Sequence, residues 1–561
     1  MTQHIVDLTL SPWTSLPSFT SSGRRNRRLL SSAMLQPLDR VDVLGDDHHG
    51  HTGCVNALSW AKNGELLISG GDDTTVRVWR MDSNDSSRDY PFKCETVIYT
   101  GHRGNVFNAH MLPHSTRIAT VAADRQLRIS DVEAAVHSPR YNGETEYTSS
   151  QANVKVLRCH SGRVKRIVTE ESPDMFLTVA EDGTVRQHDL RVPHSCASGN
   201  CPSPLVRLHH ELSTIALSSL TPYQFVVAGE APYGYLFDRR HAGRVLKEEW
   251  GIPPDSDSVT TCVRRFGRVT RGPSESRGYE HITGARMAST NGHEVLLSYS
   301  SDAVYLYSTH DDPAPESLGS RSTILPSNPS HRQSTRSSPV GNEPATIHQT
   351  DAEMEDDIER MTKEDSAMGH EYGSQDAHMD EDTDDDDDDD DAEDDDEDMN
   401  NIDSGVQDIP AASTSNVPIV YPRARFVGAC NAETVKDVNF LGPQDEYVVS
   451  GSDDGNFFIW RKATSKLHDI LEGDGSVVNV IEGHPHLPLV AVSGIDTTVK
   501  LFGPAHGPTQ FSRLRNAENI VKRNSEDRSR RIDLSSLFLH YQLARSALEA
   551  GEGPGADCPV Q

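Results

Sequence analysis

Histidine and aspartate side chains recur along this sequence at fixed spacings, and such pairs could exchange protons in general acid–base catalysis. His51 precedes Trp79 by 28 residues, and Asp73 lies six residues before the tryptophan. The spacing of 28 residues returns at His102–Ser130, His160–His188 and His209–Phe237. The spacing of six residues returns at Asp124–Ser130, Asp182–His188, Asp454–Trp460 and Asp496–Phe502. A catalytic site needs its acid and its base once. A set that recurs in several units therefore predicts a structural role.

Cysteine and histidine side chains gather in one short region, and both are usual ligands of structural zinc. Cys196 and Cys201 lie near His194, His209 and His210. The Cys-x4-Cys spacing is wider than that of common zinc motifs, and His209 also occupies a position in the repeat. The glycine-rich turns are not followed by helices, as a phosphate-binding loop requires, and no hydrolase or kinase motif occurs. We therefore expect no enzymatic activity, no metal site and no cofactor.

Two arginines follow the ends of consecutive repeats in one pattern. The third repeat ends in His188-Asp189-Leu190-Arg191, and the fourth ends 49 residues later in Phe237-Asp238-Arg239-Arg240, whereas the other repeats end differently. Equivalent positions of neighbouring repeats lie on the same side of a repeat structure. Arg191 and Arg240 could there make bidentate or stacked contacts with a partner. The alternative is that Asp-x-Arg is an ordinary end of a repeat, in which the aspartate caps a turn.

Each repeat has the pattern of short strands joined by tight turns. In the first, residues 66–68 are apolar, the turn Ser-Gly-Gly-Asp-Asp follows at 69–73, and apolar and polar residues then alternate to Trp79. The same order is found at 118–129 and 447–460. Seven units can be counted, of which the one containing 295–307 matches least well. No long helical pattern interrupts them, which predicts an all-β fold.

The Gly50-His51 and Gly101-His102 pairs, the Ser-Gly-x-Asp-Asp turn and the closing Trp79 resemble the WD repeat. This resemblance implies a seven-bladed β-propeller with one four-stranded sheet for each repeat. It also implies a buried chain in which an indole donates to a hydroxyl, the hydroxyl to an imidazole and the imidazole to a carboxylate. The members implied for this structural network are His51, Ser69, Asp73, Trp79, His102, Asp124, His160, Asp182, Asp454, Trp460 and Asp496.

The distribution of charge divides the chain into a propeller and an acidic insert. Residues 351–400 carry 27 acidic and 2 basic side chains, a net charge of −25 out of −32 for all 561 residues. Such a composition buries too little apolar surface to offset its ordering entropy, so we expect the insert to be disordered. The expected parts are a disordered or partly helical tail at 1–40, five blades at 41–308, the insert at 309–424, two blades at 425–504, and an extension at 505–561 with an amphipathic helix at about 534–550.

Part of the sequence resembles the substrate receptors of cullin-4 ubiquitin ligases. The resemblance rests on the two Asp-x-Arg segments, on the long acidic insert before the last two repeats, and on the stretches 101–107, 431–460 and 483–488. It implies a noncatalytic receptor that recruits an unknown protein substrate for ubiquitination. Binding to the damaged-DNA-binding adaptor of the cullin-4 ligase is implied for Asp189, Arg191, Asp238 and Arg240. His188 stands where that family usually has a tryptophan, so the packing behind Arg191 need not be the one found in the family.

The acidic tract leaves a second interpretation open, a chromatin scaffold in which the insert attracts histones or other basic proteins. We expect no direct sequence-specific binding of nucleic acid, because the chain lacks a globally basic field. No apolar run is long enough to cross a membrane, and the first 28 residues contain no signal-peptide core. The eight scattered cysteines fit a reducing compartment. These features predict a nuclear or cytoplasmic protein without membrane association.

Overall fold

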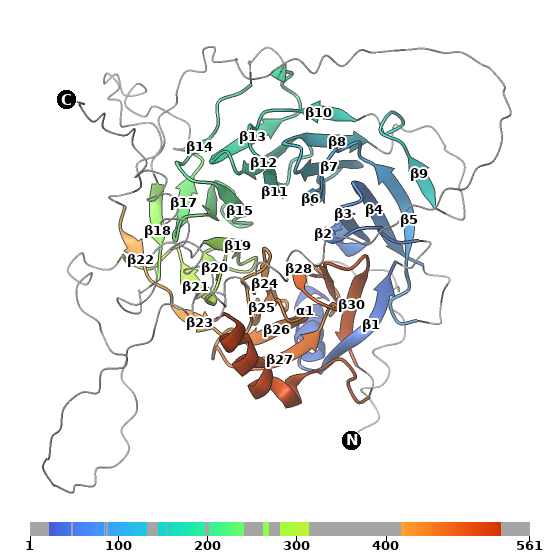
Figure 1. Cartoon of the computed structure of the whole chain (residues 1–561), viewed down its shortest axis with the longest axis vertical. Helices are drawn as coiled ribbons and strands as arrows, with labels where there is room; N and C mark the ends of the chain where they lie inside the picture. The colour runs from blue at the N-terminus through green and yellow to red at the C-terminus, as the bar shows by residue number, and fades with distance from the viewer. Residues whose placement is uncertain are drawn as a thin grey trace, which may run out of the picture. The chain divides into compact units, whose positions relative to one another are not determined.

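A computed structural model describes residues 22–45, 49–82, 85, 88–131, 144–152, 154–196, 201–240, 262–268, 281–313, 414, 417–505 and 507–528. Seven β-sheets are arranged around a ring (Figure 1). The prediction of an all-β, seven-bladed β-propeller is therefore confirmed. In the part of the chain that the structure describes, no helix has the length and apolar character needed to cross a membrane.

The strands of the first four blades follow one another along the chain, apart from β9 and β22, which extend two sheets by parallel pairing. The first blade has β2 (Val55–Ala61), β3 (Leu66–Gly71), β4 (Thr75–Met81), β5 (Phe92–Tyr99) and β9 (Thr145–Tyr147). The second has β6 (Val106–Met111), β7 (Arg117–Ala122), β8 (Leu127–Asp131) and β10 (Lys155–Leu157). The third has β11 (Val164–Thr169), β12 (Met175–Ala180), β13 (Thr184–Asp189) and β14 (Val206–Arg207). The fourth has β15 (Leu212–Leu217), β16 (Gln224–Gly229), β17 (Gly234–Asp238), β18 (Cys262–Phe266) and β22 (Ile419–Val420).

The sixth blade is continuous in the chain, whereas the fifth and the seventh each take one strand from a distant segment. The fifth has β19 (Ile282–Met287), β20 (Glu294–Tyr299), β21 (Val304–Ser308) and β23 (Ala424–Phe426). The sixth has β24 (Val438–Leu441), β25 (Tyr447–Gly451), β26 (Asn456–Arg461) and β27 (Leu467–Glu472). The seventh has β28 (Val478–Gly483), β29 (Val490–Gly494), β30 (Val499–Pro504) and β1 (Leu38–Leu44). Two short 3-10 turns lie at Lys62–Gly64 and Leu514–Asn516.

The apolar core lies between the blades. Every residue of β3, β25 and β29 is buried, because a middle strand is covered on both faces by the neighbouring sheets. Phe457 of the sixth blade, for example, meets Phe502 of the seventh edge to face, with ring centroids 4.9 Å apart. This two-sided burial explains why the middle strands are continuous apolar runs.

The ring closes through its first strand. β1 pairs with β30, from Leu38 opposite Pro504 to Leu44 opposite Val499, so residues near both ends of the propeller share one sheet. The expected start of the first blade at residue 41 therefore falls inside a strand of the seventh. The physical reason is that β1, from the N-terminal end of the propeller, covers the edge strand β30 of the seventh blade, which would otherwise be unpaired. This pairing closes the ring between the first and the last blade.

The insert also enters the ring at a different place from the one expected. β23 lies beyond the insert but forms the fourth strand of the fifth blade, with Ala424 opposite Leu306 and Phe426 opposite Val304. The insert thus interrupts a blade between its third and fourth strands, and 419–426 belong to the propeller. A three-residue strand carries too weak a pattern to be found in the sequence. Residues 314–413, with the acidic tract, lie outside the described residues.

Two helices pack on the sixth and seventh blades. Leu30 and Met34, in and just after α1 (Ser22–Ala33), join the apolar cluster that contains Tyr447, and Ser31 donates a hydrogen bond to Glu446 at 2.8 Å. A second helical stretch, 517–528, places Ile520 against the core of the sixth blade. The amphipathic helix expected at about 534–550 lies outside the described residues.

One half-buried imidazole gives the propeller a predicted dependence on pH. The Nδ1 atom of His484 accepts hydrogen bonds from the backbone N–H groups of His486 (3.0 Å) and Leu487 (2.9 Å), so this nitrogen carries no proton. Nε2 faces the carbonyl oxygen of Gly64 at 3.1 Å. Gly64 adopts a φ of +91°, and a Cβ there would come within 2.4 Å of the ring. Burial is the main reason why the pKa of His484 falls from 6.5 to about 4.

Because this pKa is lower in the folded than in the unfolded chain, the unfolded chain takes up the proton first as the pH falls. The contribution to stability is therefore complete above about pH 6.5 and is lost as the pH decreases towards 4. We expect His484 to account for about 1–2 kcal/mol of the stability lost between pH 7 and pH 4.5. Urea unfolding across this range checks the prediction, and an equal pH slope in the His484→Asn variant would contradict it.

Candidate partner-binding site

The two Asp-x-Arg segments occupy equivalent places in adjacent blades. Asp189 is the last residue of β13 and pairs with Met175, the first residue of β12. Asp238 is the last residue of β17 and pairs with Gln224, the first residue of β16. Both segments therefore lie at the same end of the third and fourth blades. We call this end of the two blades the arginine rim, defined by Asp189, Arg191, Asp238 and Arg240.

The side chains of the arginine rim adopt the same forked geometry twice. Arg191 donates from Nε to Asp189 Oδ1 at 2.8 Å and from Nη2 to Oδ2 at 2.7 Å. Arg240 donates from Nε to Asp238 Oδ1 at 2.9 Å and from Nη2 to Oδ2 at 2.5 Å. In each segment the backbone N–H of the arginine also bonds to the aspartate, at 3.0 Å. Each aspartate thus fixes the orientation of a guanidinium group two residues further on.

Both guanidinium groups face solvent even though they are held in place. The side chain of Arg191 is 61% exposed and that of Arg240 is 59% exposed. Hydrogen bonds from the side chain and backbone of Arg191 lower the pKa of Asp189 to about 2, so the fork stays ionised at neutral pH. Arg240 also stacks over the ring of Tyr223, with Cζ 3.9 Å from the ring centroid. Oriented, exposed arginines suit the recognition of a protein partner.

A further arginine, Arg239, joins the two blades that carry the forks. Its guanidinium lies 2.6 Å from Glu170 and donates to Gln187 at 2.8 Å, and both partners belong to the third blade. Arg239 thereby joins the end of the fourth blade to its neighbour. The sequence pattern assigned it no role, because the variable middle position of Asp-x-Arg carries no signal of a contact between blades.

The structure contains a third Asp–Arg fork that the sequence did not indicate. Arg423 donates to Asp311 from Nε at 2.7 Å and from Nη2 at 2.5 Å. Asp311 follows the end of β21, at the same end of the fifth blade, whereas Arg423 comes from beyond the insert and immediately precedes β23. A separation of 112 residues hides this pair in the sequence.

His188 packs behind Arg191 in the place of the expected tryptophan. Its ring stacks on Phe176, with centroids 5.1 Å apart and an interplanar angle of 19°. Its Nε2 lies 2.8 Å from the hydroxyl of Thr178, which in turn lies 2.8 Å from Nε2 of His160. Burial lowers the pKa of His188 well below its usual value, so the ring is neutral and can donate as an indole does. The buried chain then reaches Asp182, 3.0 Å from His160 Nδ1.

The first blade brings together all four residues of its network. Trp79 Nε1 donates to Ser69 Oγ at 2.8 Å, Ser69 Oγ lies 2.8 Å from His51 Nε2, and His51 Nδ1 lies 2.9 Å from Asp73 Oδ2. In the second blade His102 links Asp124, at 2.9 Å, to Thr120, at 2.9 Å. These contacts lie inside the blades, away from the arginine rim.

The sixth and seventh blades depart from this network. Trp460 donates to the backbone carbonyl of Val427 at 3.0 Å, and Asp454 accepts from Asn524 of the 517–528 helix at 3.1 Å. No histidine joins them among the described residues; buried lysines supply the positive charge. Lys436 lies 2.5 Å from Asp453, and Lys500 contacts both Asp474 and Asp496. The Gly-His pattern of the repeat contains no lysine, so the sequence did not indicate the ion pairs of Lys436 and Lys500.

The cysteine and histidine candidates separate in space. Cys196, Cys201 and His194 come together, and Cys159 from another connection joins them. His209 and His210 are not part of the group, and His210 instead packs beside Tyr235. The expectation of no metal site rested on the spacing of Cys196 and Cys201 and on the place of His209 in the repeat, and neither can indicate a ligand brought in from a neighbouring connection.

Comparisons with known proteins agree with the fold. Residues 44–80 and 423–461 match the model of the WD domain, G-beta repeat. WD repeat protein iqw1 of Schizosaccharomyces pombe is 24% identical over an alignment of 770 residues, which covers 90% of this chain and 93% of the relative. Protein ALTERED SEED GERMINATION 2 of Arabidopsis thaliana is 25% identical and covers 81% and 85%.

A human relative resembles half of the chain. DDB1- and CUL4-associated factor 6 is 30% identical over 294 residues, which cover 52% of this chain and 30% of the relative. The chain thus carries WD repeats and resembles the family of cullin-4-associated receptors.

Proposed function

We propose that this WD-repeat propeller is a noncatalytic substrate receptor of a cullin-4 ubiquitin ligase. In this proposal the arginine rim binds the ligase adaptor, and another surface of the propeller recruits the protein that is ubiquitinated. The observation that carries the proposal is the repeated fork, with Arg191 and Arg240 oriented in the same way, exposed, and placed on adjacent blades. The printed name of the human relative, which associates that protein with DDB1 and CUL4, supports the choice of partner.

The forks favour a specific partner over a general attraction to negative charge. In each one the aspartate neutralises most of the arginine charge, while its two hydrogen bonds fix the plane of the guanidinium group. Such a group stacks on, or donates to, a partner surface of matching shape, and little side-chain entropy is lost on binding. Tyr223 supports Arg240 from behind, which is typical of an arginine at the centre of an interface.

Binding of the purified full chain to purified DDB1 tests the proposal. We expect Arg191→Ala or Arg240→Ala to raise the Kd about tenfold, and the double variant to raise it about a hundredfold or more, because each removes an oriented arginine from the interface. Arg191→Lys keeps the charge but loses the planar fork, and it should fall between the wild type and the alanine variant. Biolayer interferometry gives these constants.

Arg461→Ala is the matched control, because Arg461 is exposed at the same end of the sixth blade and belongs to no Asp-x-Arg segment. It should bind DDB1 like the wild type. Circular dichroism and the Tm of all variants show whether the propeller is intact. A double variant that folds and still binds DDB1 with wild-type affinity would refute the role of the arginine rim.

A second function is favoured by the acidic insert, whose residues 351–400 have a net charge of −25. It is a scaffold that holds histones or other basic proteins through long-range electrostatic attraction. This function predicts histone binding that weakens at high salt and disappears when 351–400 are deleted. Binding that persists after the deletion would exclude the insert as the histone site.

A further inference from the structure

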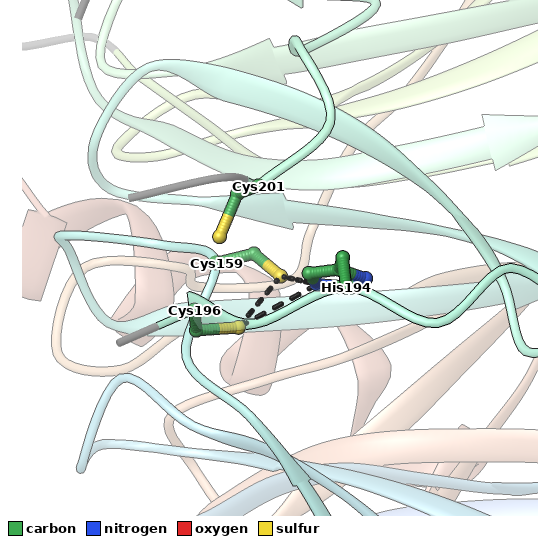
Figure 2. Close-up of side chains that lie close together, drawn as sticks. All are labelled: Cys159, His194, Cys196 and Cys201. Carbon is green, nitrogen blue, oxygen red and sulfur yellow. Dashed lines mark hydrogen bonds between the residues drawn. The ribbon is translucent and has the colours of Figure 1, made fainter. Parts of the chain in front are cut away.

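Three cysteines and one histidine converge between the second and third blades. Cys159 lies on the connection from β10 to β11, which links the two blades, whereas His194, Cys196 and Cys201 lie on the connection from β13 to β14. Figure 2 shows the four side chains directed towards one another from these two connections. We call these four residues the Cys3His cluster.

Two of the distances in the Cys3His cluster match the edges of a coordination tetrahedron, and a third is shorter by about 0.4 Å. Cys159 Sγ lies 3.6 Å from Cys196 Sγ and 3.1 Å from His194 Nε2, and Cys196 Sγ lies 3.5 Å from His194 Nε2. With Zn–S bonds of about 2.3 Å and Zn–N bonds of about 2.0 Å, tetrahedral ligand atoms lie about 3.5–3.8 Å apart. Cys201 Sγ completes the group, in which all four ligand atoms lie within 4.8 Å of one another.

We propose that the Cys3His cluster is a structural zinc site. The donor set selects the metal, because three thiolates and an imidazole suit zinc, whereas calcium and magnesium require oxygen ligands. Four protein ligands leave no open position for a substrate or water, which is the arrangement of a structural and not a catalytic site. A disulfide would use only two of the three cysteines and would leave the third, together with His194, without a role.

Groups around the cluster suit a bound thiolate. The backbone N–H of Arg158 donates to Cys196 Sγ at 3.3 Å, and hydrogen bonds of this kind orient and stabilise the ligands of a metal. All four residues are at least partly buried, so the site is sheltered without being closed to an entering ion.

The zinc ion would fasten a long connection to the body of the propeller. Sixteen residues, 190–205, separate the end of β13 at Asp189 from β14, which is only two residues long and begins at Val206. A metal bound by Cys159 ties the middle of this connection to the junction of two blades. Closing such a loop restricts the unfolded chain and stabilises the folded one.

Metal analysis of the purified full chain tests the proposal directly. The chain is expressed with added zinc, passed through gel filtration, and measured by inductively coupled plasma mass spectrometry. We expect one zinc ion per chain in the wild type and loss of the ion in Cys159→Ser and in Cys201→Ser, one variant from each connection. Cys54→Ser and His209→Gln are matched controls outside the cluster and should keep the zinc. A wild-type chain without zinc, or zinc retained by both cluster variants, would overturn the proposal.

Cobalt substitution of the wild-type chain covers the case in which a cysteine variant fails to fold. Cobalt(II) in a tetrahedral site with three thiolates gives visible d–d bands and thiolate-to-metal charge-transfer bands, and zinc displaces it. Absence of these bands would count against the site.

Removing the metal with a chelator should also speed hydrogen exchange in 190–205 while the core strands stay protected, and unchanged exchange there would contradict the structural role. None of these measurements needs the adaptor, so the zinc proposal can be refuted without refuting the receptor function, and the reverse also holds.

Discussion

Replacement of Lys436 by methionine is expected to lower the free energy of unfolding by about 3–5 kcal/mol, because it leaves a buried carboxylate without its counter-ion. The Lys436 side chain is fully buried, and that of Asp453 is 4% exposed. Their charged atoms lie 2.5 Å apart, and Lys436 Nζ also donates to the backbone carbonyl of Thr434 at 3.0 Å. Asp453 also accepts hydrogen bonds from the backbone N–H groups of Ala432 and Glu433. Without the lysine it must still stay ionised in a buried site that lacks a counter-ion, or take up a proton, and both cost free energy.

A double-mutant cycle separates the loss of the pair from the loss of packing. Lys436→Met combined with Asp453→Leu removes both charges, and we expect it to be markedly more stable than Lys436→Met alone. Lys466→Met changes an exposed lysine of the same blade and should alter the stability by less than about 0.5 kcal/mol. Guanidinium unfolding measures the wild type, the single variants Lys436→Met and Asp453→Leu, the double variant and the Lys466→Met control. A cost for Lys436→Met no greater than that of Lys466→Met would show that the pair is solvated in solution.

Replacement of Asp73 by alanine is expected to cost about 3–4 kcal/mol, because Asp73 serves four hydrogen-bonding groups and is only 7% exposed. It lies 2.9 Å from His51 Nδ1, and it accepts from the backbone N–H of Thr52 at 3.1 Å and from the N–H and hydroxyl of Thr75 at 3.1 and 2.9 Å. Alanine leaves these groups unsatisfied at the turn between β3 and β4 of the first blade. Asp72→Ala changes the adjacent aspartate of the same turn and should cost about 1 kcal/mol or less.

The cost of Asp73→Ala should depend on pH with a definite sign. Burial raises the pKa of Asp73, but the hydrogen bond and charge of His51 outweigh it and lower the pKa from 3.8 to about 2. A carboxyl whose pKa is lowered on folding stabilises the protein above its unfolded-state pKa and loses that contribution as the pH falls towards the folded-state value. The stability difference between wild type and Asp73→Ala should therefore shrink below about pH 4. A difference that grows on acidification would contradict the assigned hydrogen bonds.

The blade networks and the arginine rim occupy different parts of the blades, and we propose different roles for them. Buried chains such as that of His51 and Asp73 hold the first three sheets together, which leaves the ends of the strands free to vary. At those ends, Asp189 and Asp238 orient exposed arginines without contributing to the core. A variant of the rim should therefore change binding with little effect on stability, whereas a variant of the network should do the reverse.

The sequence by itself determined the architecture, because the pattern of a blade is local. The Gly-Asp turns and the strands around them lie within about 30 residues, and a regular spacing of such units leaves a propeller as the way to bury the faces of each sheet. The same regularity predicted that the ends of the third and fourth repeats lie side by side. It also pointed to the first-blade set of His51, Ser69, Asp73 and Trp79.

The tertiary structure alone decided the contacts between distant parts of the chain. Arg423 reaches Asp311 across the insert, β1 completes the seventh blade, and Cys159 approaches Cys196 and Cys201 from another connection. In each case the partners belong to segments of irregular length, whose placement follows from the closed ring and not from a local pattern. Side chains meet there because strands far apart in the chain share one blade, or because neighbouring blades are held at a fixed distance, and a linear sequence records neither.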